Sequence, residues 1–155
     1  MNFLITLAIF SYFFGFYFDE NSAGAGEHAG DFAHTYNNFQ IFLKYDLEEA
    51  IAHHDYFDSR PPTSYILHKL FNPFAGEQIN YRRSVFFISF FIPILFYFCL
   101  KQKFKNEENL LLILISSTIF LSPYFRTSAY WGLQENYGFI FLLLTFLSVI
   151  FLNKK

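Results

Sequence analysis

Residues 84–105 read SVFFISFFIPILFYFCLKQKFK, an apolar run that ends in a cluster of lysines. The first part of this stretch, residues 84–100, contains no charged side chain. A helix needs roughly 17–25 such residues to cross the hydrocarbon layer of a bilayer. The lysines that follow are Lys101, Lys103 and Lys105. The stretch therefore predicts a membrane-spanning helix with one basic end, and this sets the class of the whole chain.

Three further apolar blocks lie on either side of this one. Together they predict about four spans, at residues 2–18, 84–100, 109–125 and 137–152. The third block reaches spanning length only with its last four residues, and Pro123 predicts that the helix ends or bends there. The first block has no basic residue ahead of it, and bulky aromatics run up to Asp19. An uncleaved span therefore fits it better than a secretory signal peptide.

The composition agrees with this class. Hydrophobic residues make up 54% of the chain and aromatic residues 24%, and they fall into blocks that charged stretches separate. Such blocks are typical of lipid-spanning helices rather than of a globular core. The formal net charge is −2, so nothing indicates a nucleic-acid partner. The single cysteine, Cys99, cannot form a disulfide within the chain. We therefore expect an all-α integral membrane protein.

The lysines also predict an orientation. They lie between the second and third blocks and after the fourth, at Lys154 and Lys155. Short loops rich in Lys and Arg remain cytoplasmic, which places the N-terminus inside and residues 19–83 and 122–136 outside. The large first outer loop, 19–83, carries ten of the thirteen acids and all five histidines. Function should therefore be sought in this loop.

Two amphipathic helices are expected within the outer loop. Apolar residues recur at steps of three and four over residues 31–51, which predicts a helix with Asp31 as its N-cap. Its apolar face comprises Phe32, Tyr36, Phe39, Leu43, Leu47 and Ala50 or Ile51. A second helix should begin after Pro61-Pro62 and end at Asn72-Pro73. Its apolar residues are Ile66, Leu67, Leu70 and Phe71. Such helices either lie on the membrane surface or pack against other loops.

Charged side chains at two places in this loop are candidates for phosphate chemistry. Asp19 and Glu20 follow directly on the first span, so they are either a solvated helix end or a functional pair of carboxylates. Arg60 precedes two prolines that favour an extended backbone, and its guanidinium fork matches the oxygens of a phosphate. Pairing of Arg60 with Asp55 or Asp58 is the other interpretation, and the sequence leaves both open.

The histidines do not have the spacing of a standard zinc site. His53 and His54 are adjacent and would point to different faces of a helix, and His28 and His34 are six residues apart. An oxygen-ligated divalent ion, Mg²⁺ or Mn²⁺, fits the sequence better, because such ions need few protein ligands. We expect Asp19 and Glu20 to hold it together with a substrate phosphate.

In their order along the chain, these features resemble the C-class (GT-C) membrane glycosyltransferases, in the branch of protein O-mannosyltransferases and lipid A aminoarabinose transferases. The pair Asp19-Glu20 matches the acidic signature at the head of the first outer loop. The run Arg60-Pro61-Pro62-Thr63-Ser64-Tyr65 matches a later landmark, a basic residue and Pro-Pro ahead of an apolar helix. Glu135 matches an acid just before the fourth span. Members usually have more than twice as many spans, so the resemblance predicts an N-terminal part of a longer enzyme.

This resemblance implies transfer of a sugar from a polyprenyl-phosphate carrier to a lipid, glycan or protein acceptor, on the periplasmic face of the bacterial inner membrane. By the resemblance, Asp19 would be the general base or the acid that orients the acceptor, and Glu20 its catalytic partner. By charge and topology, Arg60 or Arg126 would neutralise the leaving phosphate, with Glu135 as a further substrate-binding residue. Two other classes remain open. A transporter is disfavoured because no span has a central charge, and a structural membrane subunit would need no single outer acid.

Overall fold

The chain is all-helical in the part that the structure describes. The computed structural model describes residues 2–21 and 28–152 and has no strand within those ranges. Its elements are α1 (Asn2–Tyr17), α2 (His28–Lys44), α3 (Leu47–Ala52), α4 (Thr63–Phe71), α5 (Gln78–Ser89), α6 (Phe91–Lys103), α7 (Asn109–Ser117), the 3₁₀ helix η1 (Thr118–Leu121), α8 (Pro123–Tyr130) and α9 (Glu135–Leu152). Residues 22–27 of the expected outer loop and the two lysines at 154 and 155 lie outside the described residues.

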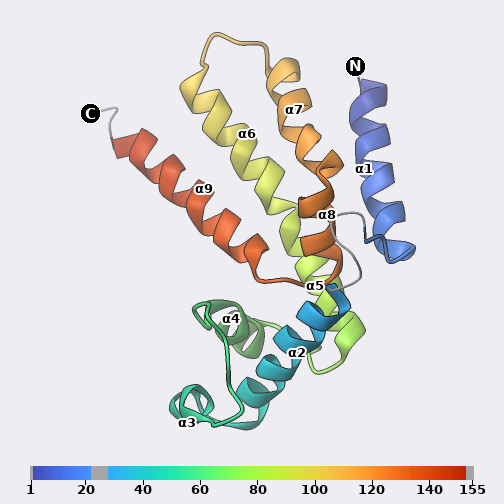
Figure 1. Ribbon diagram of the computed structural model, residues 1–155. Helices are drawn as coiled ribbons and strands as arrows, with labels where there is room; N and C mark the ends of the chain where they lie inside the picture. The colour runs from blue at the N-terminus through green and yellow to red at the C-terminus, as the bar shows by residue number, and fades with distance from the viewer. Residues whose placement is uncertain (1, 22–27, 153–155) are drawn as a thin grey trace.

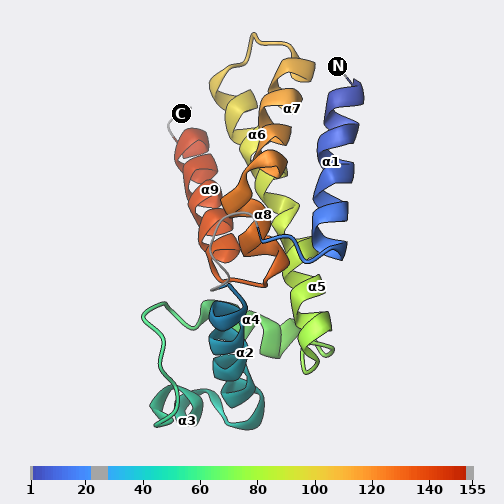
Figure 2. The same cartoon turned by 45° about the vertical axis from the view of Figure 1, so that its right-hand side comes forward.

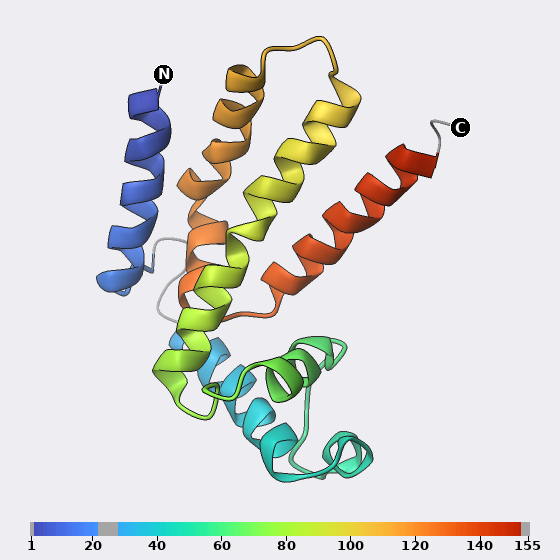
Figure 3. The ribbon, with the colours of Figure 1, turned by 180° about the vertical axis from the view of Figure 1, so that it is seen from behind.

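The helices form an apolar bundle with a polar layer at one end (Figure 1). Helices α1, α6, α7 and α9 make up the bundle, and α2, α3 and α4 make up the polar layer. The start of α1, the end of α9 and the α6–α7 connection all lie at the opposite end of the bundle (Figures 2 and 3). The lysine-rich connection is therefore remote from the polar layer.

Within residues 2–21 and 28–152, two helices are long and apolar enough to cross a membrane. One is Gln78–Lys103, which comprises α5 and α6, and the other is Glu135–Leu152, which is α9. Only 11% of the residues in α9 are buried within the protein, although the helix is almost entirely apolar. A helix that is hydrophobic all round needs an apolar environment, and here the protein itself supplies little of it. This surface is compatible with a membrane location.

The third apolar block is a bent pair of helices. Residues Asn109–Leu121 and Pro123–Tyr130 meet at an angle of 64°, which confirms the predicted break at Pro123. Ser122 caps the second helix, since its side chain accepts a hydrogen bond from the Phe125 N–H, and proline is favoured in a first helical turn. Helix α1 is apolar but shorter than a full span. Length and composition thus support two spans, or three with the bent pair, and the expectation of four stays a prediction.

The amphipathic helix expected over residues 31–51 is two helices. Helix α2 ends at Lys44 and α3 begins after Asp46, while Asp31 lies in the first turn of α2 rather than at its N-cap. Phe32, Tyr36 and Phe39 are buried as predicted. Phe42 is the next buried residue, whereas Leu43 and Leu47 are exposed. The expected face was wrong at Leu43 and Leu47, whereas Ala50 is buried as predicted. The chain turns after Lys44, so one helical stripe does not continue into α3.

Helix α4 has the predicted bounds but a different buried face. It begins after Pro61-Pro62 and ends at Phe71, with Asn72 as its C-cap. Its buried residues are Ser64, Tyr65 and His68, whereas Leu70 and Phe71 are exposed. The polar side turns inward because it finds hydrogen-bond partners there: His68 Nε2 lies 2.5 Å from the Tyr137 hydroxyl of α9.

Two aromatic clusters hold these layers together. The first joins the polar layer to α5 and α9 and contains Phe32, Tyr36, Phe39, Phe42, Ala50, Tyr65, Ala75, Tyr81, Val85 and Tyr137. The second joins α1 to α5, α6 and α8 and contains Ala8, Tyr12, Phe86, Ile92, Phe120, Phe125, Ala129 and Tyr130. Trp131 packs against both clusters, so the junction of the bundle and the polar layer is continuously packed.

Candidate functional site

The end of α1 places Asp19 and Glu20 in two different directions. The Glu20 N–H donates to the Gly15 carbonyl at 2.9 Å, and the Asp19 N–H donates to the Phe16 carbonyl at 3.3 Å. This is the pattern of a Schellman C-cap, with Asp19 in the left-handed position that glycine usually occupies. Its φ is 50°, the one positive value at a non-glycine residue within 2–21 and 28–152. Aspartate tolerates this conformation better than most residues, but it is still strained.

Asp19 lies beside a firmly held arginine. Arg82 Nη2 donates to Asp19 Oδ1 at 2.5 Å, and Arg82 Nε donates to the Tyr130 carbonyl at 2.8 Å. The guanidinium also lies over the Trp131 ring, 4.6 Å from its centroid. The Asp19 side chain remains 62% exposed. Arg82 therefore holds a carboxylate that solvent or a ligand can still reach.

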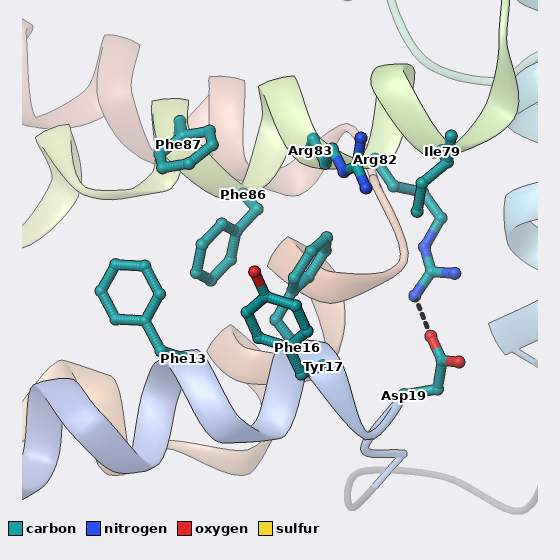
Figure 4. A pocket seen from close by; sticks show the side chains of 9 residues that line it. All are labelled: Phe13, Phe16, Tyr17, Asp19, Ile79, Arg82, Arg83, Phe86 and Phe87. Atoms are coloured by element: carbon teal, nitrogen blue, oxygen red, sulfur yellow. Dashed lines mark hydrogen bonds and ion pairs between the residues drawn. The ribbon is translucent and has the colours of Figure 1, made fainter.

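A pocket of about 210 Å³ opens between α1 and α5 at this carboxylate. Its lining residues are Phe13, Phe16, Tyr17, Asp19, Ile79, Arg82, Arg83, Phe86 and Phe87. Figure 4 shows that the pocket is polar at one end, where Asp19 and Arg82 meet, and aromatic at the other. The exposed Arg83 adds a second cation, and its Nη1 donates a long hydrogen bond of 3.4 Å to Asn80 Oδ1. The pocket thus combines a charged end, with two arginines and one carboxylate, and an apolar wall.

Glu20 lies in a different environment, against a buried arginine. Arg126 Nε donates to Glu20 Oε1 at 2.8 Å, and Arg126 Nη2 donates to Glu20 Oε2. Arg126 Nη1 donates to Ser11 Oγ at 2.9 Å and to the Phe120 carbonyl at 3.3 Å, and Nη2 also reaches the Ser11 carbonyl at 2.9 Å. A guanidinium has five N–H donors, and these contacts use all of them. We therefore leave Arg126 out of the candidate phosphate site.

Gly15 makes this buried pair possible. An added Cβ at this position would lie 2.5 Å from Glu20 Oε2 and 2.6 Å from Arg126 Nη2. It would also lie 2.5 Å from the Tyr130 hydroxyl, which donates to the Tyr12 carbonyl at 2.7 Å. Real Cβ atoms do not approach other heavy atoms this closely, so the ion pair occupies space that only glycine leaves open.

Arg60 and Glu135 form a third pair, away from the first two. Arg60 Nη2 lies 2.9 Å from Glu135 Oε1, at the start of α9, and both residues line a pocket of about 240 Å³. Sequence analysis considered Asp55 or Asp58 as the partner of the Arg60 side chain, and the structure provides Glu135 instead. The pairing crosses from the polar layer to α9, which local spacing could not reveal.

Asp58 contacts the backbone of Arg60 rather than its side chain. The Arg60 N–H donates to Asp58 Oδ1 at 3.0 Å, and Tyr65 and Gln134 each donate to Asp58 Oδ2 at 2.6 Å. Partial burial alone would raise the pKa of this carboxyl, but the hydrogen bonds outweigh burial and lower it. Asp58 thus stays ionised and fixes the loop that carries Arg60.

The candidate site residues are therefore distributed over three places. Asp19 lines the aromatic pocket, Glu20 and Arg126 line another, and Arg60 and Glu135 line a third. Asp19 and Glu20 contact different arginines, and the expectation that they hold a divalent ion together stays a prediction. Sequence analysis missed Arg82 and Arg83, although two adjacent arginines directly before an apolar block were the available signal.

Comparison of the chain with models of protein families, with curated proteins and with solved structures finds no match in any of the three. Function is therefore argued from the residues and their geometry.

Proposed function

We propose that this protein is a membrane glycosyltransferase that uses a sugar donor linked to a polyprenyl phosphate. In this proposal α1, α5–α6, the bent α7–α8 pair and α9 are membrane segments, and the polar layer lies on the outer side. The single observation that supports it best is the exposed Asp19 carboxylate at the cationic end of an aromatic pocket, next to the end of an apolar helix. A lipid-linked phosphate presents its charge at this level of a bilayer.

The two arginines of the pocket have separate tasks in the proposed reaction. Arg82 is a positioning residue. Its Nη2 contacts the Asp19 carboxylate, and stacking on the Trp131 ring fixes the guanidinium in place. Arg83 is exposed and binds the donor phosphate by charge. The aromatic wall formed by Phe13, Phe86 and Phe87 takes the first part of the prenyl chain.

Asp19 acts as the general base in the proposed reaction. The acceptor hydroxyl oxygen forms a bond to the anomeric carbon while the bond from that carbon to the phosphate oxygen breaks. The hydroxyl proton passes to the Asp19 carboxylate, and the lipid phosphate leaves with the electron pair, stabilised by Arg83. The predicted divalent ion has no part in this scheme, because Arg82 contacts the Asp19 carboxylate and Arg83 supplies the positive charge for the phosphate.

Sugar transfer tests the role of Asp19. Membranes from a deletion strain that carries each variant are given a labelled polyprenyl-phosphate sugar, and transfer is measured at matched protein levels. Loss of a general base costs about 10²–10⁴-fold in rate, so Asp19→Asn should lose this much. Asp46→Asn is the matched control, because Asp46 is exposed and its side chain makes no capping hydrogen bond. Equal rates for Asp19→Asn and wild type would remove Asp19 from the catalytic role.

Donor binding tests the role of Arg83 separately. Arg83→Gln should weaken binding of polyprenyl phosphate to the purified chain by about tenfold, the value of one charged hydrogen bond. Native mass spectrometry in detergent can measure this. Arg60→Gln is the control, because Arg60 lines a different pocket and is paired with Glu135. Equal weakening by both variants would show that the charge effect is general and would reject the pocket as the donor site.

A further inference from the structure

Three metal-ligating side chains lie together where α3 ends. One ring nitrogen of His53, one of His54 and a carboxylate oxygen of Asp55 all lie within 4.8 Å of one another. Asp55 Oδ2 is 3.3 Å from His54 Nε2 and 3.9 Å from His53 Nδ1. Small adjustments of these side chains would bring all three donor atoms to coordination distance of about 2.0–2.2 Å from one ion.

A turn, rather than a helix, brings the two histidines together. His53 is the C-cap of α3, with an extended backbone (φ −66°, ψ 133°), and the Tyr56 N–H donates to the His53 carbonyl at 2.9 Å. His54 and Asp55 are thus the central residues of a four-residue turn. On a helix the two adjacent histidines would diverge, as their spacing suggested, but residues 53–56 form a turn after the end of α3.

Neighbouring groups fix the orientation of the rings. The rings of His53 and His54 stack with centroids 4.6 Å apart, and the His53 ring also packs on Tyr45 at 4.7 Å. The Asp55 N–H donates to His53 Nδ1 at 3.2 Å. This nitrogen is therefore an unprotonated acceptor, which is the form that binds a metal. Metal binding would exchange this long hydrogen bond for a coordination bond.

The cluster borders a polar cavity of about 570 Å³ between the turn and α2. Besides the three donors, its walls include Asn37, Gln40 and Lys44 of α2. An ion held by the turn would thus keep an open coordination position toward a cavity with space for water and a small polar ligand.

We propose that His53, His54 and Asp55 form a binding site for a divalent transition-metal ion, of which Zn²⁺ is the test case. Two imidazoles and one carboxylate with an open fourth position make a donor set that zinc accepts. Imidazole nitrogen favours zinc, copper and nickel, whereas magnesium and calcium favour oxygen ligands. The proposal does not depend on the proposed glycosyltransferase activity, since none of these residues lines the Asp19 pocket.

Zinc titration tests the site directly. The full chain, purified in detergent without a histidine tag, competes for Zn²⁺ with a chromophoric chelator. Wild type should bind one equivalent, and His54→Ala and Asp55→Asn should each weaken binding by at least about tenfold, since even outer-shell changes cost 10–100-fold. Glu48→Gln, an exposed carboxylate of α3, should bind like wild type. The His54 side chain is 83% exposed, so its removal leaves the fold intact, which circular dichroism checks.

Copper provides a second readout that does not depend on affinity. Electron paramagnetic resonance of the Cu²⁺-loaded chain should show two imidazole nitrogens in wild type and one in His54→Ala. Mg²⁺ in hundredfold excess should not displace zinc. Equal zinc affinity of wild type and His54→Ala, or an unchanged number of coordinating nitrogens in that variant, would overturn the proposal.

Discussion

Asp19 and Glu20 close the same helix, but the regions around them differ. The region around Glu20 is partly buried and saturated with hydrogen bonds, since every N–H of the buried Arg126 has an acceptor there. The region around Asp19 is open, and the carboxylate lies at the mouth of a pocket with an exposed cation nearby. Two adjacent acids of one short motif can therefore have separate tasks. Glu20 ties α1 to α8, while Asp19 is available to a ligand.

The two ion pairs, Glu20–Arg126 and Asp19–Arg82, should contribute differently to the free energy of unfolding. Removing one partner of a buried ion pair leaves an uncompensated charge and costs about 3–5 kcal/mol. A pair that solvent reaches contributes only about 0–1 kcal/mol. The comparison can therefore be tested by substitutions at each place, with unfolding followed in detergent by the loss of helical signal.

The largest effect is expected from Arg126→Ala. It should lower the free energy of unfolding by about 3–5 kcal/mol, because the partly buried Glu20 carboxylate loses its partner and the Ser11 and Phe120 acceptors lose their donor. Arg83→Ala is the control and should change it by less than about 0.5 kcal/mol, as an exposed surface substitution. The double variant Glu20→Gln with Arg126→Met should regain part of the loss. A single-variant loss below about 1 kcal/mol would contradict the structural role of the pair.

His68 extends the comparison to a buried group without charge. Burial lowers its pKa from 6.5 to about 4, while Tyr137 and Asn72 hydrogen-bond its two ring nitrogens. Between pH 6.5 and about 4, His68 is protonated in the unfolded chain but neutral in the folded chain. The free energy of unfolding is therefore highest above pH 6.5 and falls as the pH decreases toward 4. The total loss should be about 3 kcal/mol. Unfolding of wild type and His68→Gln at pH 7, 6, 5 and 4.5 measures this loss. If the free energy of unfolding depends on pH equally in both proteins, His68 is not the cause.

Gly15→Ala tests the space that the buried pair occupies. The new methyl group would meet Glu20 and Arg126, which are held in their network and cannot move without losing hydrogen bonds. We expect a loss of about 1–3 kcal/mol, the usual range for overpacking. Gly138→Ala is a matched control, because an added Cβ there meets no atom within 4 Å. Equal stability of the two variants would show that the pair tolerates displacement.

The smallest change in stability is expected from Asp19→Gly. Glycine adopts the left-handed conformation without strain, which offsets the lost contact with Arg82, so stability should stay within about 1 kcal/mol of wild type. Sugar transfer should nevertheless be lost to the same extent as in Asp19→Asn. A strained residue kept for function would show this combination. A destabilisation above about 2 kcal/mol would mean that Asp19 is structural, like Glu20.

Local chemistry made several elements predictable. The apolar blocks become α1, the α5–α6 helix and α9, because continuous apolar runs leave few alternatives to a helix. Pro123 breaks the third block as expected, and the prolines at 61 and 62 precede α4. In each case one or two residues act on their immediate neighbours, so no distant partner is needed for the prediction.

Buried faces were less predictable, since they depend on what packs opposite. Periodicity predicted that Leu43 is buried in α2 and Leu70 in α4. The buried residues are instead Phe42 and the polar His68. Tyr137 of α9 supplies the partner that lets His68 turn inward. A helical pattern contains no information about such a partner.

The helical, largely apolar character of this protein and the helix boundaries at its prolines thus follow from local sequence. Only the tertiary structure decided what each charge does. The Asp19–Arg82 contact joins residues 63 positions apart, and the Glu20–Arg126 contact joins residues 106 apart. Pairings over such distances arise from packing of whole helices, which composition and spacing do not encode. The turn that gathers His53, His54 and Asp55 is local, and it follows α3, which packs against α2.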